Sequence, residues 1–300
     1  MLNTKLFEEE MEKINFSIDI QDIEGIPTEM GRKLVRTDTD TPLGIIKSKY
    51  KPILHKQAFQ GALQEMKNGG LTLENAEVKI DSYENGAMAK MEVLLPEKTT
   101  QIGDHNLSLK YVARNSYNGR WKFQSFFGWL NHVCFNTLVT GQKLAYTSNR
   151  HTKSFDIDQS NKKIVNAVKA VTDETERFKR WWDISVEDVQ IKKLFENTIA
   201  KQNLSKGSRL AGVSETNQKQ LAILMGLYNE EVTQIHGKGD YGRNDAKGSL
   251  WCAYQSATAW STHLTDINRN DTKKYLVQVD RQKLVSEMVE TKNWKELEDA

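Results

Sequence analysis

The sequence predicts an α+β fold, with an antiparallel β-meander and packed helices in the N-terminal half and a mainly helical C-terminal half. Two observations carry this prediction. Alternating apolar and polar runs between residues 71 and 117 surround the hairpin signal Asn85-Gly86, and beyond residue 159 apolar residues recur every three to four positions. There is no apolar run of about 18 residues and no apolar leader, so we expect a soluble protein.

The N-terminal half divides into two expected parts. Residues 1–40 form an acidic N-terminal arm, because seven carboxylates and only two lysines precede Gly25. Residues 41–158 form an α+β core with a basic, aromatic-rich segment. Its expected elements are a strand over 43–53, a helix over 56–67 that ends at Asn68-Gly69-Gly70, strands over 71–83, 87–97 and 106–117, and, after Asn118-Gly119, a strand from Trp121 that continues into a helix up to Thr140.

The C-terminal part, residues 159–300, is expected to be a helical region. Ser185 and the acidic residues after it are typical of a helix start. Residues 236–248 form a glycine-rich loop, which favours a surface turn over a phosphate-binding loop because the P-loop spacing is missing. The expected helices cover 161–180, the segment after Ser185, 216–230, 250–264 and an amphipathic tail over 271–300.

Charge is balanced over the whole chain but not along it. The 42 Lys and Arg residues nearly equal the 40 Asp and Glu residues, which argues against a wholly basic nucleic-acid-coating protein and against a disordered acidic chain. Residues 105–155, however, contain no Asp or Glu, while they contain seven cations and ten aromatic residues. Cations interleaved with aromatic rings suit a surface that neutralises phosphates and stacks bases.

This segment supplies the candidate DNA-binding residues. Trp121 is the favoured stacking residue, because Arg120 and Lys122 flank it just after a turn, where a side chain would be exposed. The alternative is that the aromatic residues belong to the core and the cations to a solvated face. The full set is Lys110, Arg114, Tyr117, Arg120, Trp121, Lys122, Arg150, His151 and Lys153.

The sequence contains no recognisable catalytic motif. Its six histidines are scattered without ligand-pair spacing, and Cys134 among apolar neighbours is typical of a buried small side chain. We therefore expect no enzymatic activity, catalytic residue, metal or cofactor. A nucleic-acid-processing enzyme that uses His151, His236 and His263 with a metal is a third, less favoured hypothesis.

Five segments together resemble a family of phage- and plasmid-borne domains of unknown function. They are LGIIKSKYKPI, NSYNG, VCFNTL, the RHT at 150–152, and WCAYQSATAWSTH, which occur in the family's order over residues 43–265. Tyr117, Asn131, Gln255 and Thr262 depart from the family's usual polar residues. The resemblance implies a phage-like origin. The expected architecture is also similar to that of phage RecT and Red-beta single-strand annealing proteins, which are oligomeric rings or filaments.

These observations lead to one functional prediction and one alternative. The chain is expected to be a phage-type, ATP-independent protein that binds and anneals single-stranded DNA as a homo-oligomeric ring or filament, without a membrane partner, in the cytoplasm of a bacterial host. The alternative is a non-enzymatic phage accessory protein that binds a host or defence protein through the same basic segment.

Overall fold

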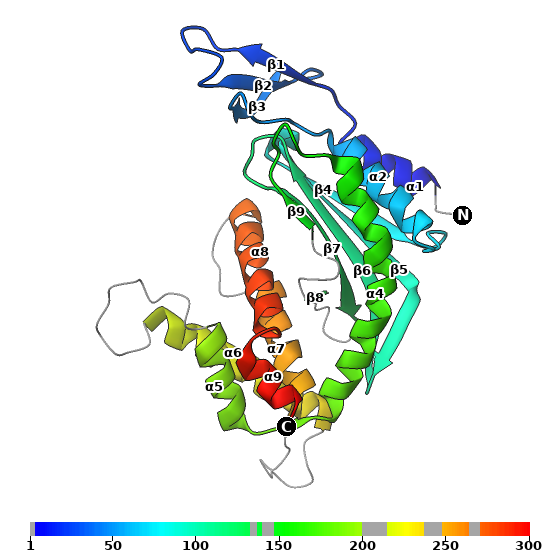
Figure 1. Ribbon diagram of the computed structural model, residues 1–300, viewed down its shortest axis with the longest axis vertical. Coiled ribbons are helices and arrows are strands. Elements are labelled where there is room, and N and C mark those ends of the chain that lie inside the picture. The colour runs from blue at the N-terminus through cyan, green and yellow to red at the C-terminus, as the bar shows by residue number, and fades with distance from the viewer. Residues whose placement is uncertain (1–3, 133–136, 140–146, 200–214, 237–247, 264–270) are drawn as a thin grey trace. The chain divides into compact units, whose positions relative to one another are not determined.

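A computed structural model describes residues 4–132, 137–139, 147–199, 215–236, 248–263 and 271–300 (Figure 1). The chain forms two compact units, each built from several chain segments. The first unit comprises Met1–Thr99, Ser108–Gly128 and Lys143–Val171, and the second comprises Thr100–Leu107, Trp129–Gln142 and Thr172–Ala300. These boundaries differ from the sequential division into arm, core and helical region that the sequence predicts.

The first unit begins with a helix and a small antiparallel sheet, where the sequence predicts an arm. Helix α1 (Thr4–Glu12) lies against β4 (Glu77–Tyr83), and the Glu10 carboxylate accepts a hydrogen bond from the backbone N–H of Ile80. Met11 and Ile14 are buried, so this segment is folded onto its own unit. The small sheet contains β1 (Ile18–Asp22), β2 (Arg32–Arg36) and β3 (Thr41–Ile46), in that order.

A larger sheet carries the predicted meander. Its strand order follows the chain from β4 to β8, and β9 pairs with β7. The predicted Asn85-Gly86 signal lies between β4 and β5, but the connection is longer than a two-residue turn, because Tyr83 pairs with Met88 and Glu84–Gly86 forms the 3-10 turn η1. Glu84, Asn85 and Gly86 all have positive φ. The remaining strands are β5 (Met88–Ile102), β6 (His105–Ser116), β7 (Phe123–Asn131), β8 (Thr137–Val139) and β9 (Thr147–Asn149).

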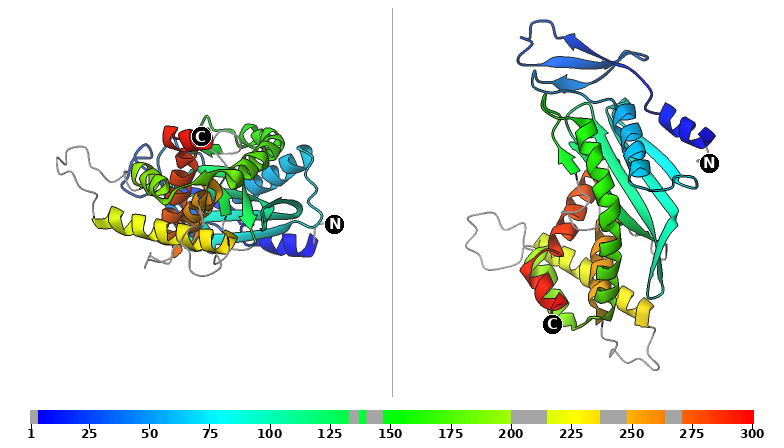
Figure 2. Two further views of the ribbon diagram at one scale, coloured as in Figure 1. Left: turned by 90° about the horizontal axis from the view of Figure 1, so that it is seen from below. Right: turned by 45° about the vertical axis from the view of Figure 1, so that its right-hand side comes forward.

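Two helices lie side by side on one face of this sheet in the first unit (Figure 2). Helix α2 (His55–Asn68) ends at Gly69, as predicted, and buries the face that includes Phe59 and Met66. Helix α4 (Ile157–Asp183) contributes its first half to this unit. The Asn161 amide donates a hydrogen bond to the carbonyl of Ala58, and Gly61 gives Asn161 the room to approach. The two helices therefore pack closely where α4 begins.

The second unit is built around helix α7 (Leu250–Thr262), which is buried on all sides because α6 and α8 pack against it. Its core is aromatic: Trp181 packs against both Tyr254 and Trp294, with ring centroids 4.9 Å apart in each pair. The other elements are α5 (Asp188–Thr198), α6 (Glu215–His236), α8 (Asp271–Met288), α9 (Lys292–Glu298), and the paired two-residue strands β10 (Ser185–Val186) and β11 (Gly248–Ser249). No helix among these described residues is long and apolar enough to cross a membrane.

The structure confirms the α+β class and corrects three local predictions. The expected helix up to Thr140 is wrong, because Phe123–Asn131 is strand β7 and Thr137–Val139 is strand β8. Nearly every residue of β7 is buried, so its apolar residues fill both faces and imitate helical spacing. The expected strand over 43–53 ends at Ile46. Helix α5 starts after Glu187, which forms a capping box with Gln190, and Ser185 instead lies in β10.

Candidate nucleic-acid interface

Four of the nine predicted DNA-binding residues are buried. Tyr117 is fully buried and Trp121 is 5% exposed, so neither ring has a face available to stack on a base. The prediction of base stacking by these two residues is therefore wrong for this structure. Arg114 is also buried, with its guanidinium 5.3 Å from the centre of the Phe126 ring, and His151 is buried as well. All four help to hold the first unit together.

A hydrogen-bonded network around His55 explains the burial of Tyr117. The Tyr117 hydroxyl accepts a hydrogen bond from the backbone N–H of His55 (3.0 Å), and the two rings are 4.0 Å apart. The His55 ring donates from Nε2 to the carbonyl of Gly86 (2.9 Å) and accepts at Nδ1 from the Asn115 amide (2.9 Å). This arrangement requires a neutral ring, and burial lowers the pKa of His55 to about 3.

His151 makes a second buried link, which joins two chain segments. The Tyr50 hydroxyl donates to the carbonyl of Ser116 (2.7 Å), so its oxygen accepts from Nδ1–H of His151 (2.6 Å). Burial lowers the pKa of His151 to about 4, which keeps this ring neutral too. Next to it, the N–H of Lys51 donates to the carbonyl of His151 (3.1 Å), and Tyr50 forms a β-bridge with Thr152. Residues 47–51 are thereby held beside residues 150–153.

The other predicted residues are cations that point away from the core, with one exception. Arg120, Lys122, Arg150 and Lys153 are exposed, whereas Lys110 lies on the sheet, where it forms an ion pair with Glu92 (3.1 Å). Strands β7 and β9 are antiparallel and pair Phe123 with Asn149. Lys122, just before β7, and Arg150, just after β9, therefore lie at the same end of the two strands. Arg120 forms an ion pair with Glu84. The structure therefore brings four predicted cations to one end of the sheet.

Sequence reasoning missed three further cations at this end. Lys47, Lys49 and Lys51 are all exposed, and the contacts around Tyr50 place their segment beside residues 150–153. The signal that could have identified them is the three lysines of KSKYK within five residues. In the structure this segment is a turn, in which the N–H of Tyr50 donates to the carbonyl of Lys47 (2.9 Å). We call the seven exposed cations of these three segments the basic rim: Lys47, Lys49, Lys51, Arg120, Lys122, Arg150 and Lys153.

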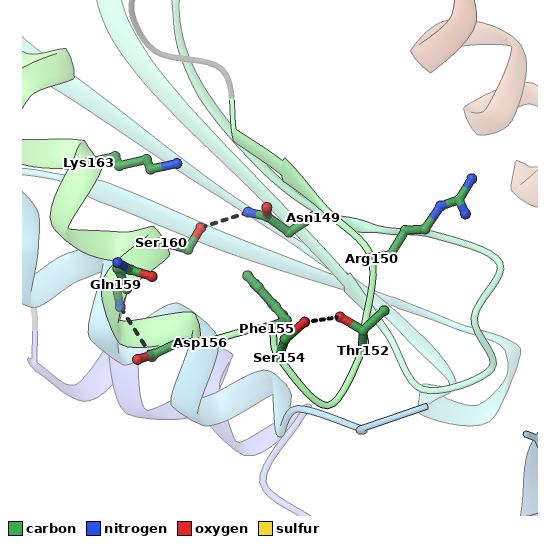
Figure 3. A pocket seen from close by; sticks show the side chains of 9 residues that line it. All are labelled: Asn149, Arg150, Thr152, Ser154, Phe155, Asp156, Gln159, Ser160 and Lys163. Atoms are coloured by element: carbon green, nitrogen blue, oxygen red, sulfur yellow. Dashed lines mark hydrogen bonds between the residues drawn. The ribbon is translucent and has the colours of Figure 1, made fainter. Parts of the chain in front are cut away.

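A pocket with a volume of about 240 Å³ adjoins the basic rim at the start of α4 (Figure 3). Arg150 and Lys163 are its cations, and Asp156 is its only carboxylate among the lining residues. The Asn149 amide donates to the hydroxyl of Ser160 (3.1 Å), which fixes one wall. The complete lining is Asn149, Arg150, Thr152, Ser154, Phe155, Asp156, Gln159, Ser160 and Lys163.

The second unit contains a buried polar cluster whose side chains bond to one another. Asn131 donates to the side-chain oxygen of Gln255 (3.2 Å) and contacts Nδ1 of His105, whose other neighbours include the Trp251 ring. Burial lowers the pKa of His105. Asn131 and Gln255, two of the residues that depart from the family resemblance, thus bond to each other. Trp251 is itself fully buried, so it offers no stacking face.

Metal binding finds no geometric support in the described part of the chain. Its His, Cys, Asp and Glu residues form no group of three or more that could hold a metal ion. Cys252 is buried beside Ser249, and burial raises the pKa of its thiol. Cys134, the side chain of His236 and most of the glycine-rich loop over 236–248 lie outside the residues that the structure describes.

The comparisons with known proteins agree with one part of the sequence prediction. A family model described as a domain of unknown function, DUF932, matches residues 42–285. No curated protein matches the chain, and no solved structure matches it. The predicted likeness to an uncharacterised domain family is confirmed, whereas the phage origin and the similarity to annealing proteins stay predictions. Because the family model covers most of the chain, the protein belongs to the DUF932 family.

Proposed function

We propose that this protein binds single-stranded DNA along the basic rim and anneals complementary strands, without ATP and as a homo-oligomer. The observation that carries the proposal is the convergence of seven exposed cations from three distant segments on one end of the first unit's sheet. Lysine and arginine side chains placed along a surface neutralise successive phosphates of a strand. The phage-like origin that the sequence resemblance implies fits a role in DNA recombination.

The rim makes a quantitative prediction about salt. Each phosphate that a cation neutralises contributes about −0.7 to the slope of log affinity against log salt for a single strand. If all seven cations of the rim act, the slope is about −5, which corresponds to a loss of affinity of about a thousandfold between 50 and 200 mM salt. Arg120 contributes least, because Glu84 already pairs with it.

Fluorescence anisotropy with a labelled oligothymidylate, measured across this salt range, tests the rim. Lys122→Ala with Lys153→Ala should make the slope shallower by about 1.4, because two neutralised phosphates are lost. The control, Lys67→Ala with Lys98→Ala, removes the same charge from exposed residues on α2 and β5 and should leave the slope close to that of the wild type. Equal effects of the two pairs, or affinity that does not change with salt, would refute binding at the rim.

Annealing and assembly need a separate experiment. Mass photometry with and without the oligonucleotide should show DNA-dependent assemblies at low salt, and a renaturation assay should show faster pairing of complementary strands without ATP. A protein that stays small and indifferent to DNA would remove the annealing proposal and favour the alternative, a phage accessory protein that binds a host or defence protein.

A further inference from the structure

We propose that the pocket at the start of α4 binds a phosphate monoester, namely the terminal phosphate of the DNA strand; the identity of this ligand rests on the proposed function. The first argument is charge. Arg150 and Lys163 both line the pocket, and Asp156 is the one lining carboxylate. Figure 3 shows Lys163 directed toward Asn149, while Arg150 extends outward from the neighbouring position.

Asp156, the lining carboxylate, is used by the helix. Its carboxylate Oδ1 accepts hydrogen bonds from the backbone N–H groups of Asp158 (2.9 Å) and Gln159 (3.2 Å). The carboxylate thus caps the helix, and these N–H groups are already used. The ligand must therefore be recognised by side chains and not by the end of the helix.

The neutral lining supplies hydrogen-bond donors suited to phosphate oxygens. Ser160 accepts from Asn149, so the hydroxyl keeps its own proton to donate (Figure 3). Thr152 and Ser154 bond to each other (3.1 Å), and one hydroxyl of such a pair also keeps its proton. Lys163, directed toward Asn149, together with these hydroxyl and amide groups matches the charge and the acceptor oxygens of a phosphate, and Arg150 adds positive charge from the neighbouring position.

Size and charge favour a terminal phosphate over an internal one. The volume of about 240 Å³ is below the range of about 300–1,000 Å³ that drug-sized ligands occupy, so the pocket has room for a phosphate and part of its sugar. A terminal phosphate carries about −1.5 to −2 charges near neutral pH. It is attached to a single nucleotide, so the strand has to leave the pocket on one side only. The exposed cations Lys122 and Lys153 would then contact the phosphates that follow.

The test compares oligothymidylates that carry a 5′-phosphate, a 3′-phosphate or no terminal phosphate, each titrated into the full-length protein. We expect one phosphorylated end to bind about tenfold more tightly than the unphosphorylated strand, the size of one charge-assisted hydrogen bond. Lys163→Ala should abolish this preference. Lys162→Ala is the matched control, because Lys162 is exposed on the same turn and does not line the pocket. Gln159→Glu, which adds a negative charge to the lining, should also abolish the preference.

The outcomes separate this site from the basic rim. If all strands bind equally, or if Lys162→Ala and Lys163→Ala act equally, the pocket proposal is overturned even when the rim variants lose affinity. Titration of thymidine 5′-phosphate by calorimetry tests the pocket independently of binding to longer DNA. Binding of this nucleotide that disappears in Lys163→Ala but not in Lys162→Ala supports the pocket, even for a protein that shows no affinity for longer DNA.

Discussion

The two buried histidines of the first unit should make its stability depend steeply on mild acid. His55 and His151 are neutral in the folded protein, with pKa values of about 3 and about 4, while an unfolded histidine has a pKa of about 6.5. The unfolded chain therefore binds more protons below pH 6.5, so stability is fully present above this pH and falls as the pH drops toward 4. Between pH 7 and pH 5 each ring costs about 2 kcal/mol, or about 4 kcal/mol together.

Urea unfolding at pH 7, 6 and 5 measures this effect. The variants His55→Gln and His151→Asn each keep a donor near the position of the ring N–H and do not titrate, so the double variant should lose about 4 kcal/mol of the dependence on pH. The comparison with the wild type is essential, because burial raises the pKa of Glu231 to about 7 and this group gains stability as the pH falls.

An NMR titration of the wild-type imidazoles gives an independent reading that does not need the variants to fold. Neither ring should protonate above pH 5. A midpoint between 6 and 7 for both rings, or the same dependence on pH in the double variant and the wild type, would refute the assignment of neutral, hydrogen-bonded histidines.

Three further substitutions test the packing of the two units. Tyr117→Phe removes the acceptor of the buried His55 N–H and should cost about 1–3 kcal/mol in urea unfolding; an unchanged midpoint would contradict this hydrogen bond. Gly103→Ala should lower the melting temperature, because Gly103 has φ of +54° and an added Cβ would lie 2.1 Å from the Trp182 ring. An unchanged melting temperature would contradict this backbone conformation. Trp294→Ala should cost about 3–5 kcal/mol, measured by chemical denaturation, since this ring is fully buried; a loss under 1 kcal/mol would contradict its place in the core.

Local signals account for the parts of the fold that sequence reasoning predicted. The Asn85-Gly86 and Asn118-Gly119 signals marked where the chain reverses between strands, because turn chemistry depends on adjacent residues. They did not predict that the first connection spans residues 84–87. A local signal also predicted α4, where apolar residues recur at helical spacing over a long segment. Most of strand β7 was predicted as a helix, because apolar residues such as Phe126 and Phe127 are buried on both of its faces. Whether both faces of a strand are buried depends on the elements that pack on the sheet, which its own sequence does not reveal.

Sequence reasoning predicted only part of the candidate site, because some of its residues depend on partners that are distant in the chain. The lack of acids over 105–155 correctly pointed to exposed cations such as Lys122 and Lys153. The burial of Tyr117 and the link between Tyr50 and His151 depend on partners 62 and 101 residues away in the chain. No pattern within one segment contains that information, so the stacking role assigned to Tyr117 could not be rejected from the sequence.

The link between Tyr50 and His151 has a consequence for the evolution of the basic rim. The side chains that hold the segments 47–51 and 150–153 together face inward, whereas the lysines that these segments display face outward. Exchanging an exposed lysine usually alters stability by no more than about 0.5 kcal/mol. Selection can therefore change the positive charge of the basic rim one residue at a time, while Tyr50 and His151 continue to hold the two segments together.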